Sequence, residues 1–207
     1  MQIRKYTLLS VIMLLFLTAT FTWLYKNHLR RAVNKVMAYH EEDIGSITKI
    51  RNGQVQLFYK NNWEDFKIQG VHLNSFTPGY ARNKSNVDQE DILLWLEQIS
   101  KLNANLISIP NIQPPAFYDA IYKFNLEKEH PIYIVHEIPL DEKAVLQFYD
   151  AYDQRILKHL KKDIKNTIDV IHGNGVVLDN SRHHMGIYLS DLSAYNLGYI
   201  IGGNTNA

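Results

Sequence analysis

The chain has 207 residues, with 22 Lys and Arg against 21 Asp and Glu, and it contains no cysteine. This near balance of charge leaves no electrostatic footprint for nucleic acid, which we therefore exclude as a partner. The absence of cysteine excludes disulfides, thiolate metal sites and cysteine nucleophiles. An aromatic content of 12%, with 13 tyrosines, fits a packed domain or a ligand-stacking surface rather than a disordered chain.

The first predicted element is a membrane-spanning helix within residues 1–26. Between Lys5 and Lys26 lie 20 residues without a formal charge, and about 20 apolar residues span a bilayer. Trp23 and Tyr25 lie near the end of this run, where aromatic rings favour the membrane interface. The alternative is a cleavable signal peptide, for which LTATF is a poor exit site. We expect a retained signal-anchor, with the membrane as a partner and the chain as a single-pass protein of the cell membrane.

Two further segments precede the predicted core. Residues 27–45 predict a polar juxtamembrane helix or linker, and residues 46–65 predict a β-hairpin. In the hairpin, Asn52-Gly53 lies between two alternating runs and favours a type I′ turn, because both central positions need positive φ. Asn61-Asn62 predicts a second turn. We interpret the hairpin as a lid or plug that leads into the first core strand.

Residues 66–207 alternate between strand and helix patterns. Asp88 is a candidate N-cap for the first helix, and the second helix starts with proline, whose missing N–H costs nothing there. Four such βα units in series predict a parallel sheet with right-handed crossovers. The strands are expected at Ile68–Leu73, 104–112, 131–140 and 197–203, and the helices within 87–103, 114–129 and 151–175.

Chemistry in such sheets is found at the carboxyl ends of the strands. Polar residues follow each expected strand there, and they are typical of hydroxyl-binding sites. At each position the alternative is a structural role, as a turn-forming asparagine or a core histidine. His136 and Glu137 are adjacent in a strand, so only one of them can face the site. The candidate substrate-binding residues are His72, Asn74, Asn111, Glu137 and Asn204.

No cofactor or metal is expected. The adjacent His183 and His184 have no third ligand at a recognised spacing, which favours a surface role. No GxGxxG, Walker, GxSxG or kinase motif is present, so nucleotide-dependent chemistry has no support.

Several ordered segments resemble a known family. They include IQGVHLNSFTPG, QPPAFYDAIYKFN, PIYIVHEI, DVIHGN and DLSAYNLGYIIG, between about Phe66 and Gly203. Together they resemble the first half of a bacterial membrane-anchored glycoside-hydrolase-like (β/α)8 barrel, related to the family 2 glycosidase barrel. The resemblance implies carbohydrate binding at the strand ends and a carboxylate pair on the fourth and seventh strands. It also favours an extracytoplasmic position for the domain, although a count of flanking positive charges points to the cytoplasm.

The sequence departs from that family at three points. Ser108 stands where the second strand of the family usually carries an arginine. Asn204 stands at about the position of the acid/base glutamate, and an amide cannot deliver a proton as a carboxylic acid does. The seventh strand, with its nucleophile, is not in this chain. We therefore assign no catalytic residue.

These observations predict an α/β fold: a partial (β/α)8 barrel of about four βα units, preceded by the hairpin and the transmembrane helix. The first hypothesis is a barrel fragment that binds carbohydrate without hydrolysing it, from a truncated reading frame. The second is a membrane-tethered, non-catalytic scaffold of envelope polysaccharide assembly. Open sheet edges also invite a partner chain or self-association.

Overall fold

The computed structural model describes residues 11–22, 39–41, 44–75, 87–150, 152–178 and 184–202. The chain divides into two compact units, Met1–Ser46 and Ile47–Ala207, and each is described by itself.

The first unit contains a helix over residues 11–22 and a short antiparallel pair of strands. Strand β1 (Tyr39–Glu41) pairs with β2 (Ile44–Ser46) where the sequence predicts a polar helix or linker. Among the described residues no helix is long and apolar enough to cross a membrane. The predicted transmembrane segment is therefore wrong, and with it the predicted single-pass placement in the cell membrane.

The second unit begins with a three-stranded antiparallel meander. It consists of β3 (Thr48–Arg51), β4 (Gln54–Tyr59) and β5 (Asn62–Asp65). The first turn has φ of 52° at Asn52 and 77° at Gly53, which confirms the type I′ turn. The second turn lies one residue earlier than predicted, at Lys60 and Asn61, both with positive φ.

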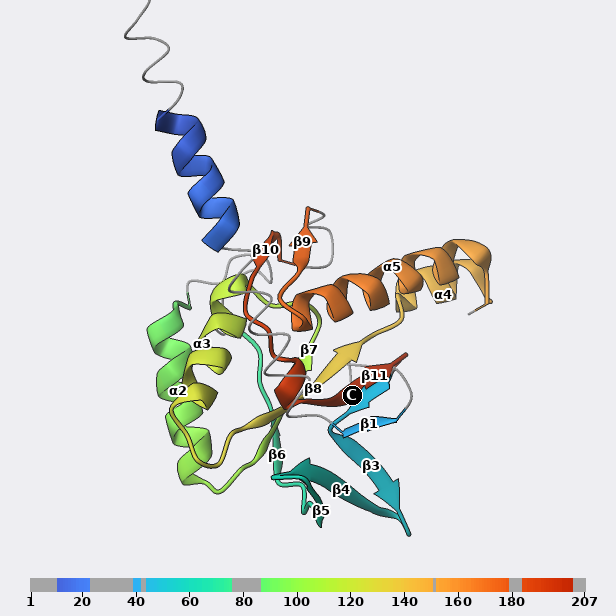
Figure 1. Ribbon diagram of the computed structural model, residues 1–207. Helices are drawn as coiled ribbons and strands as arrows, with labels where there is room; N and C mark the ends of the chain where they lie inside the picture. The colour runs from blue at the N-terminus through green and yellow to red at the C-terminus, as the bar shows by residue number, and fades with distance from the viewer. Residues whose placement is uncertain are drawn as a thin grey trace, which may run out of the picture. The chain divides into compact units, whose positions relative to one another are not determined.

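The predicted parallel sheet of four strands is present (Figure 1). Its strands lie in the order β11-β8-β7-β6, so each strand is a neighbour of the next along the chain. All three pairings in this sheet are parallel. The strands are β6 (Gly70–His72), β7 (Leu106–Pro110), β8 (Tyr133–Ile138) and β11 (Asn196–Ile201).

Helices α2 (Gln89–Lys101), α3 (Pro115–Leu126) and α5 (Gln154–Ile171) pack on one face of this sheet. Ile107 and Ile134 are neighbours in register and lie in one buried cluster with residues of all three helices. A sequential strand order with right-handed crossovers places every helix on the same side. Asp88 is the N-cap of α2, as predicted, and it forms a capping box with Asp91.

Four shorter elements of this unit were not predicted. Helix α4 (Glu142–Phe148) follows β8, and its first turn is capped by Asp141. Strands β9 (Gly175–Val177) and β10 (Gly186–Tyr188) form a small antiparallel ribbon, and a 3₁₀ turn, η1 (Ser193–Tyr195), leads into β11. Each has at most seven residues, too few to show a clear period in the sequence.

The meander covers the amino-terminal half of the sheet face that carries no helices. The ring of Phe66 packs edge-on against Tyr133, at 5.3 Å between centroids, and Thr48 Oγ1 donates to the carbonyl oxygen of Leu197 at 2.8 Å. Tyr133 and Leu197 lie near the amino ends of β8 and β11. These contacts place the expected lid or plug at the amino ends of the strands.

Candidate functional site

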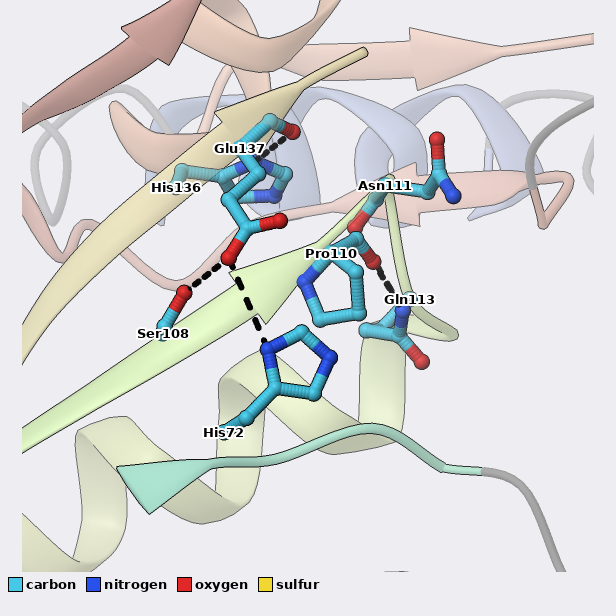
Figure 2. Close-up of polar contacts among 7 residues, drawn as sticks. All are labelled: His72, Ser108, Pro110, Asn111, Gln113, His136 and Glu137. Carbon is cyan, nitrogen blue, oxygen red and sulfur yellow. Dashed lines mark hydrogen bonds and ion pairs between the residues drawn. The ribbon is translucent and has the colours of Figure 1, made fainter. Parts of the chain in front are cut away.

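A polar cluster lies at the carboxyl ends of β6, β7 and β8 (Figure 2). One carboxylate oxygen of Glu137 accepts a hydrogen bond from the hydroxyl of Ser108. The same oxygen lies 3.5 Å from Nδ1 of His72. The side chain of Glu137 is 15% exposed and that of His72 is 50% exposed. The cluster is therefore mostly buried at Glu137 and accessible to solvent at His72.

The strand register explains why these three side chains meet. His72 is paired with Ser108, and Ser108 is paired with Val135, two residues before Glu137. Side chains two residues apart in a strand point to the same face. All three therefore project from the face opposite the helices, above the part covered by the meander.

His136 faces the other way, as the alternation requires. It is fully buried among the helices, where its Nε2 lies 2.9 Å from the Tyr118 hydroxyl and its Nδ1 lies 3.1 Å from the Glu137 carbonyl oxygen. A carbonyl only accepts, so Nδ1 carries the hydrogen and Tyr118 donates to Nε2. Burial raises the pKa of Tyr118 well above its usual value, which keeps the phenol as the donor.

The loops that follow β6 and β7 are tied together beneath the site. The buried Gln113 accepts from both the backbone N–H and the hydroxyl of Ser75, at 3.0 and 2.8 Å. Its amide nitrogen donates to the carbonyl oxygen of Pro110. Gln113 thus links the loop after β6 to the end of β7.

The remaining predicted residues do not join this cluster in the same way. The side chain of Asn111 points away from Glu137 and His72 (Figure 2), and its backbone adopts φ of 54° in a turn where asparagine is well tolerated. Asn74 is half-buried two residues beyond β6. Asn204 and His183 lie outside the described residues. The described segments contain no group of three His, Asp or Glu side chains that would hold a metal ion.

Sequence reasoning missed Ser108 as a member of the site. The signal was present, because serine is the one polar residue in the strand LISIP and lies in register with His72. The family resemblance says of this position only that related barrels usually carry an arginine there. In the structure this serine is half-buried and fixes the position of the Glu137 carboxylate.

The order of contacts limits the chemistry that this cluster supports. A nucleophilic triad needs the serine hydroxyl on one histidine nitrogen and the acid on the other. Here the Ser108 hydroxyl is bonded to Glu137, and His72 approaches the same carboxylate through Nδ1. The group is thus a polar surface with an exposed imidazole edge, suited to binding hydroxyl groups.

Comparison with family models, with curated proteins and with solved structures gave no match for this chain. The function therefore has to be argued from the geometry of the site.

Proposed function

We propose that the cluster of His72, Ser108 and Glu137 binds a carbohydrate without hydrolysing its glycosidic bonds. The observation that carries this proposal is the shared Glu137 oxygen, which lies between a serine hydroxyl and a half-exposed imidazole at the carboxyl ends of the strands. Sugar hydroxyls both donate and accept hydrogen bonds. A carboxylate supplies acceptors, and an imidazole supplies one further donor or acceptor.

An apolar residue beside the cluster supports the same ligand class. Ile200 is paired in register with Glu137 and is 45% exposed. A sugar ring has apolar C–H faces as well as hydroxyl edges, so a polar cluster next to an aliphatic side chain matches both parts. The resemblance of the sequence to glycosidase-like barrels points to the same class of ligand.

The proposed lack of hydrolysis follows from the carboxylates. Glycosidases use two, at about 5–5.5 Å in retaining enzymes and about 6.5–9.5 Å in inverting ones. The next acidic residue with a described side chain after Glu137 is Asp141, and its carboxylate accepts from the backbone N–H of Ala144 as the cap of α4. Asp141 therefore does not supply the second carboxylate that a glycosidase mechanism needs, and we assign Glu137 a role in binding the sugar.

A glycan array followed by calorimetry with the best-bound oligosaccharide tests this proposal. We expect E137Q to weaken binding at least about tenfold, because a hydrogen bond to a charged group contributes about 1.5–3 kcal/mol. H72A should weaken binding less. E97Q is the matched control, since Glu97 pairs with Lys128 on the surface of α2 at 2.8 Å and should leave binding unchanged.

Two results would overturn the proposal. One is an array without a bound glycan, or equal affinity of wild type and E137Q for the best one, which would favour a scaffold role. The other is release of nitrophenol from 4-nitrophenyl glycosides by the purified chain that is lost in E137Q. That result would show hydrolysis.

A further inference from the structure

A cavity of about 250 Å³ lies between the segment after β8, helix α4 and the first half of α5. His72, Ser108 and Glu137 are not among the residues that line it, so it is a different site from the cluster at the strand ends. Its lining residues are Pro139, Leu140, Asp141, Ala144, Phe148, Arg155, Ile156, His159, Leu160 and Asp163.

The cavity arises where one face of α4 meets one face of α5. Ile156, Leu160 and Asp163 are four and three residues apart, and Ala144 and Phe148 are four apart. These spacings place each set on a single helix face. Ala144 contributes only a methyl group to its face, which leaves the space between the two helices unfilled. Protein interiors rarely leave so large a gap, and concave apolar sites of this kind are typical of ligand binding.

The walls of the cavity are mainly aliphatic and aromatic. Leu140, Ala144, Phe148 and Leu160 are half-buried, and Ile156 is 3% exposed. An engineered apolar cavity of about 150 Å³ stays free of water and binds benzene. The larger cavity here, about 250 Å³, therefore has room for one six-membered ring with a short substituent.

Each formally charged side chain in the lining already has a partner within the chain. Arg155 binds Asp153 through two nitrogens, at 2.7 and 2.9 Å. Asp141 accepts from the backbone N–H of Ala144 at 3.1 Å. Asp163 is 4% exposed and has a contact of its own within the chain. A ligand therefore needs no charge to match the wall, and an ionised ligand would lose its hydration there without gaining a free counter-charge.

We propose that this cavity binds a small uncharged ligand built on one aromatic ring. The ring lies against Leu140, Phe148 and Leu160. Phe148 is held in place for this contact, because the Arg155 guanidinium lies 3.5 Å from the centroid of its ring, and aromatic rings favour offset or edge contacts with one another. This site does not depend on carbohydrate binding at Glu137, and the two proposals fail independently.

Toluene is the probe, and ¹H–¹⁵N correlation spectra of the full chain report its binding. We expect saturable shifts of α4 and α5 amides with a Kd on the order of 1 mM. Benzylamine, which is a cation at neutral pH, and benzoate, which is an anion, have nearly the same shape as toluene. Both should bind at least about tenfold more weakly, because their charge would be desolvated. This series uses the wild-type chain, so it does not depend on the folding of a variant.

Two variants test whether the ligand occupies this cavity. A144L fills the cavity without changing a charge, and it should abolish the shifts. K143L is the matched control, because it adds a leucine at the neighbouring exposed position of α4, outside the lining, and it should leave the shifts unchanged. Absence of saturable shifts in the wild type, binding of benzylamine or benzoate as tight as that of toluene, or unchanged binding to A144L would each overturn the proposal.

Discussion

The carboxylate of Glu137 on β8 lies 3.5 Å from Nδ1 of His72 on β6, across the intervening strand β7. This contact joins residues 65 positions apart in the chain. It sets which edge of the imidazole faces the protein, and it turns the Nε2 edge of His72 away from Glu137.

The first prediction concerns the tautomer of His72. A carboxylate beside Nδ1 favours hydrogen on that nitrogen, so the neutral ring should carry Nδ1–H. Long-range ¹H–¹⁵N spectra at pH 8 measure the population directly. E137A should reduce the Nδ1–H form, whereas S108A, which keeps the carboxylate, should retain most of it. An equal mixture of the two tautomers in the wild type would contradict the assigned contact.

The second prediction concerns the C-terminal cap of α5. Gly173 has φ of 66°, and a Cβ there would lie 2.8 Å from the carbonyl oxygen of Leu189 and 3.0 Å from the backbone nitrogen of Asp191. G173A should therefore lower the free energy of unfolding by about 3 kcal/mol, from backbone strain together with overpacking. Urea unfolding measures this change.

G53A is the matched control for that substitution. Gly53 also has positive φ, at 77°, but a Cβ added there would meet nothing within 4 Å. Only the backbone strain remains, so the loss should be about 1 kcal/mol. An equal loss in the free energy of unfolding for both variants would show that the close contacts at Gly173 do not contribute to the cost of a Cβ there.

The third prediction concerns the start of α2. The Asp88 carboxylate accepts from the backbone N–H groups of Glu90 and Asp91, both at 2.9 Å. D88A removes these bonds and should cost about 1 kcal/mol of stability. E90A changes a side chain of the same first turn that takes no part in the capping box, and it should cost only a few tenths of a kcal/mol. Thermal unfolding followed by circular dichroism compares the two.

The fourth prediction concerns alkaline pH. Burial raises the pKa of Tyr133 to about 12, and neighbouring phenols at Tyr59 and Tyr195 add to the shift. Burial also raises the pKa of Tyr199 to about 12. An unfolded tyrosine titrates near 10, so the stabilisation is complete below pH 10 and is lost as the pH rises towards 12.

Urea unfolding at several pH values between 9 and 12 measures this loss, and absorbance at 295 nm follows the phenolates. Y133F should make the fall in stability shallower, because phenylalanine does not titrate. A free energy of unfolding that stays constant across this interval would show that the phenols are not protected by burial.

The strands of the sheet were predictable because their physics is local. Runs such as LISIP and YIVHEI are buried on both faces of a parallel sheet, so they lack polar alternation over most of their length. The Asp88 cap and the Asn52-Gly53 turn were predictable for the same reason, since each depends on a few adjacent residues.

The face of α5 was less predictable. The spacing of Ile156, Leu160, Ile164, Ile168 and Ile171 indicates one apolar stripe, yet Ile168 is 38% exposed while Asp163 and Thr167 are buried. A helix can bury a short polar side chain where a cavity or a partner receives it, and that depends on neighbouring elements which the periodicity of one helix does not describe. The Glu137–Ser108 contact could not be predicted for a related reason. It depends on the register between two strands, which the sequence of either strand alone does not specify.

The plug at the amino ends of the sheet has a consequence for the order of folding. Thr48 and Leu197, which it joins, are 149 residues apart. Closing so long a loop is slow compared with forming a hairpin, because chain entropy is lost before any contact compensates. On the ribosome the meander leaves the tunnel long before β11 is made. The hydrogen bond from Thr48 to Leu197 therefore forms only after β11 is made, whereas the packing of Phe66 against Tyr133 requires only β8.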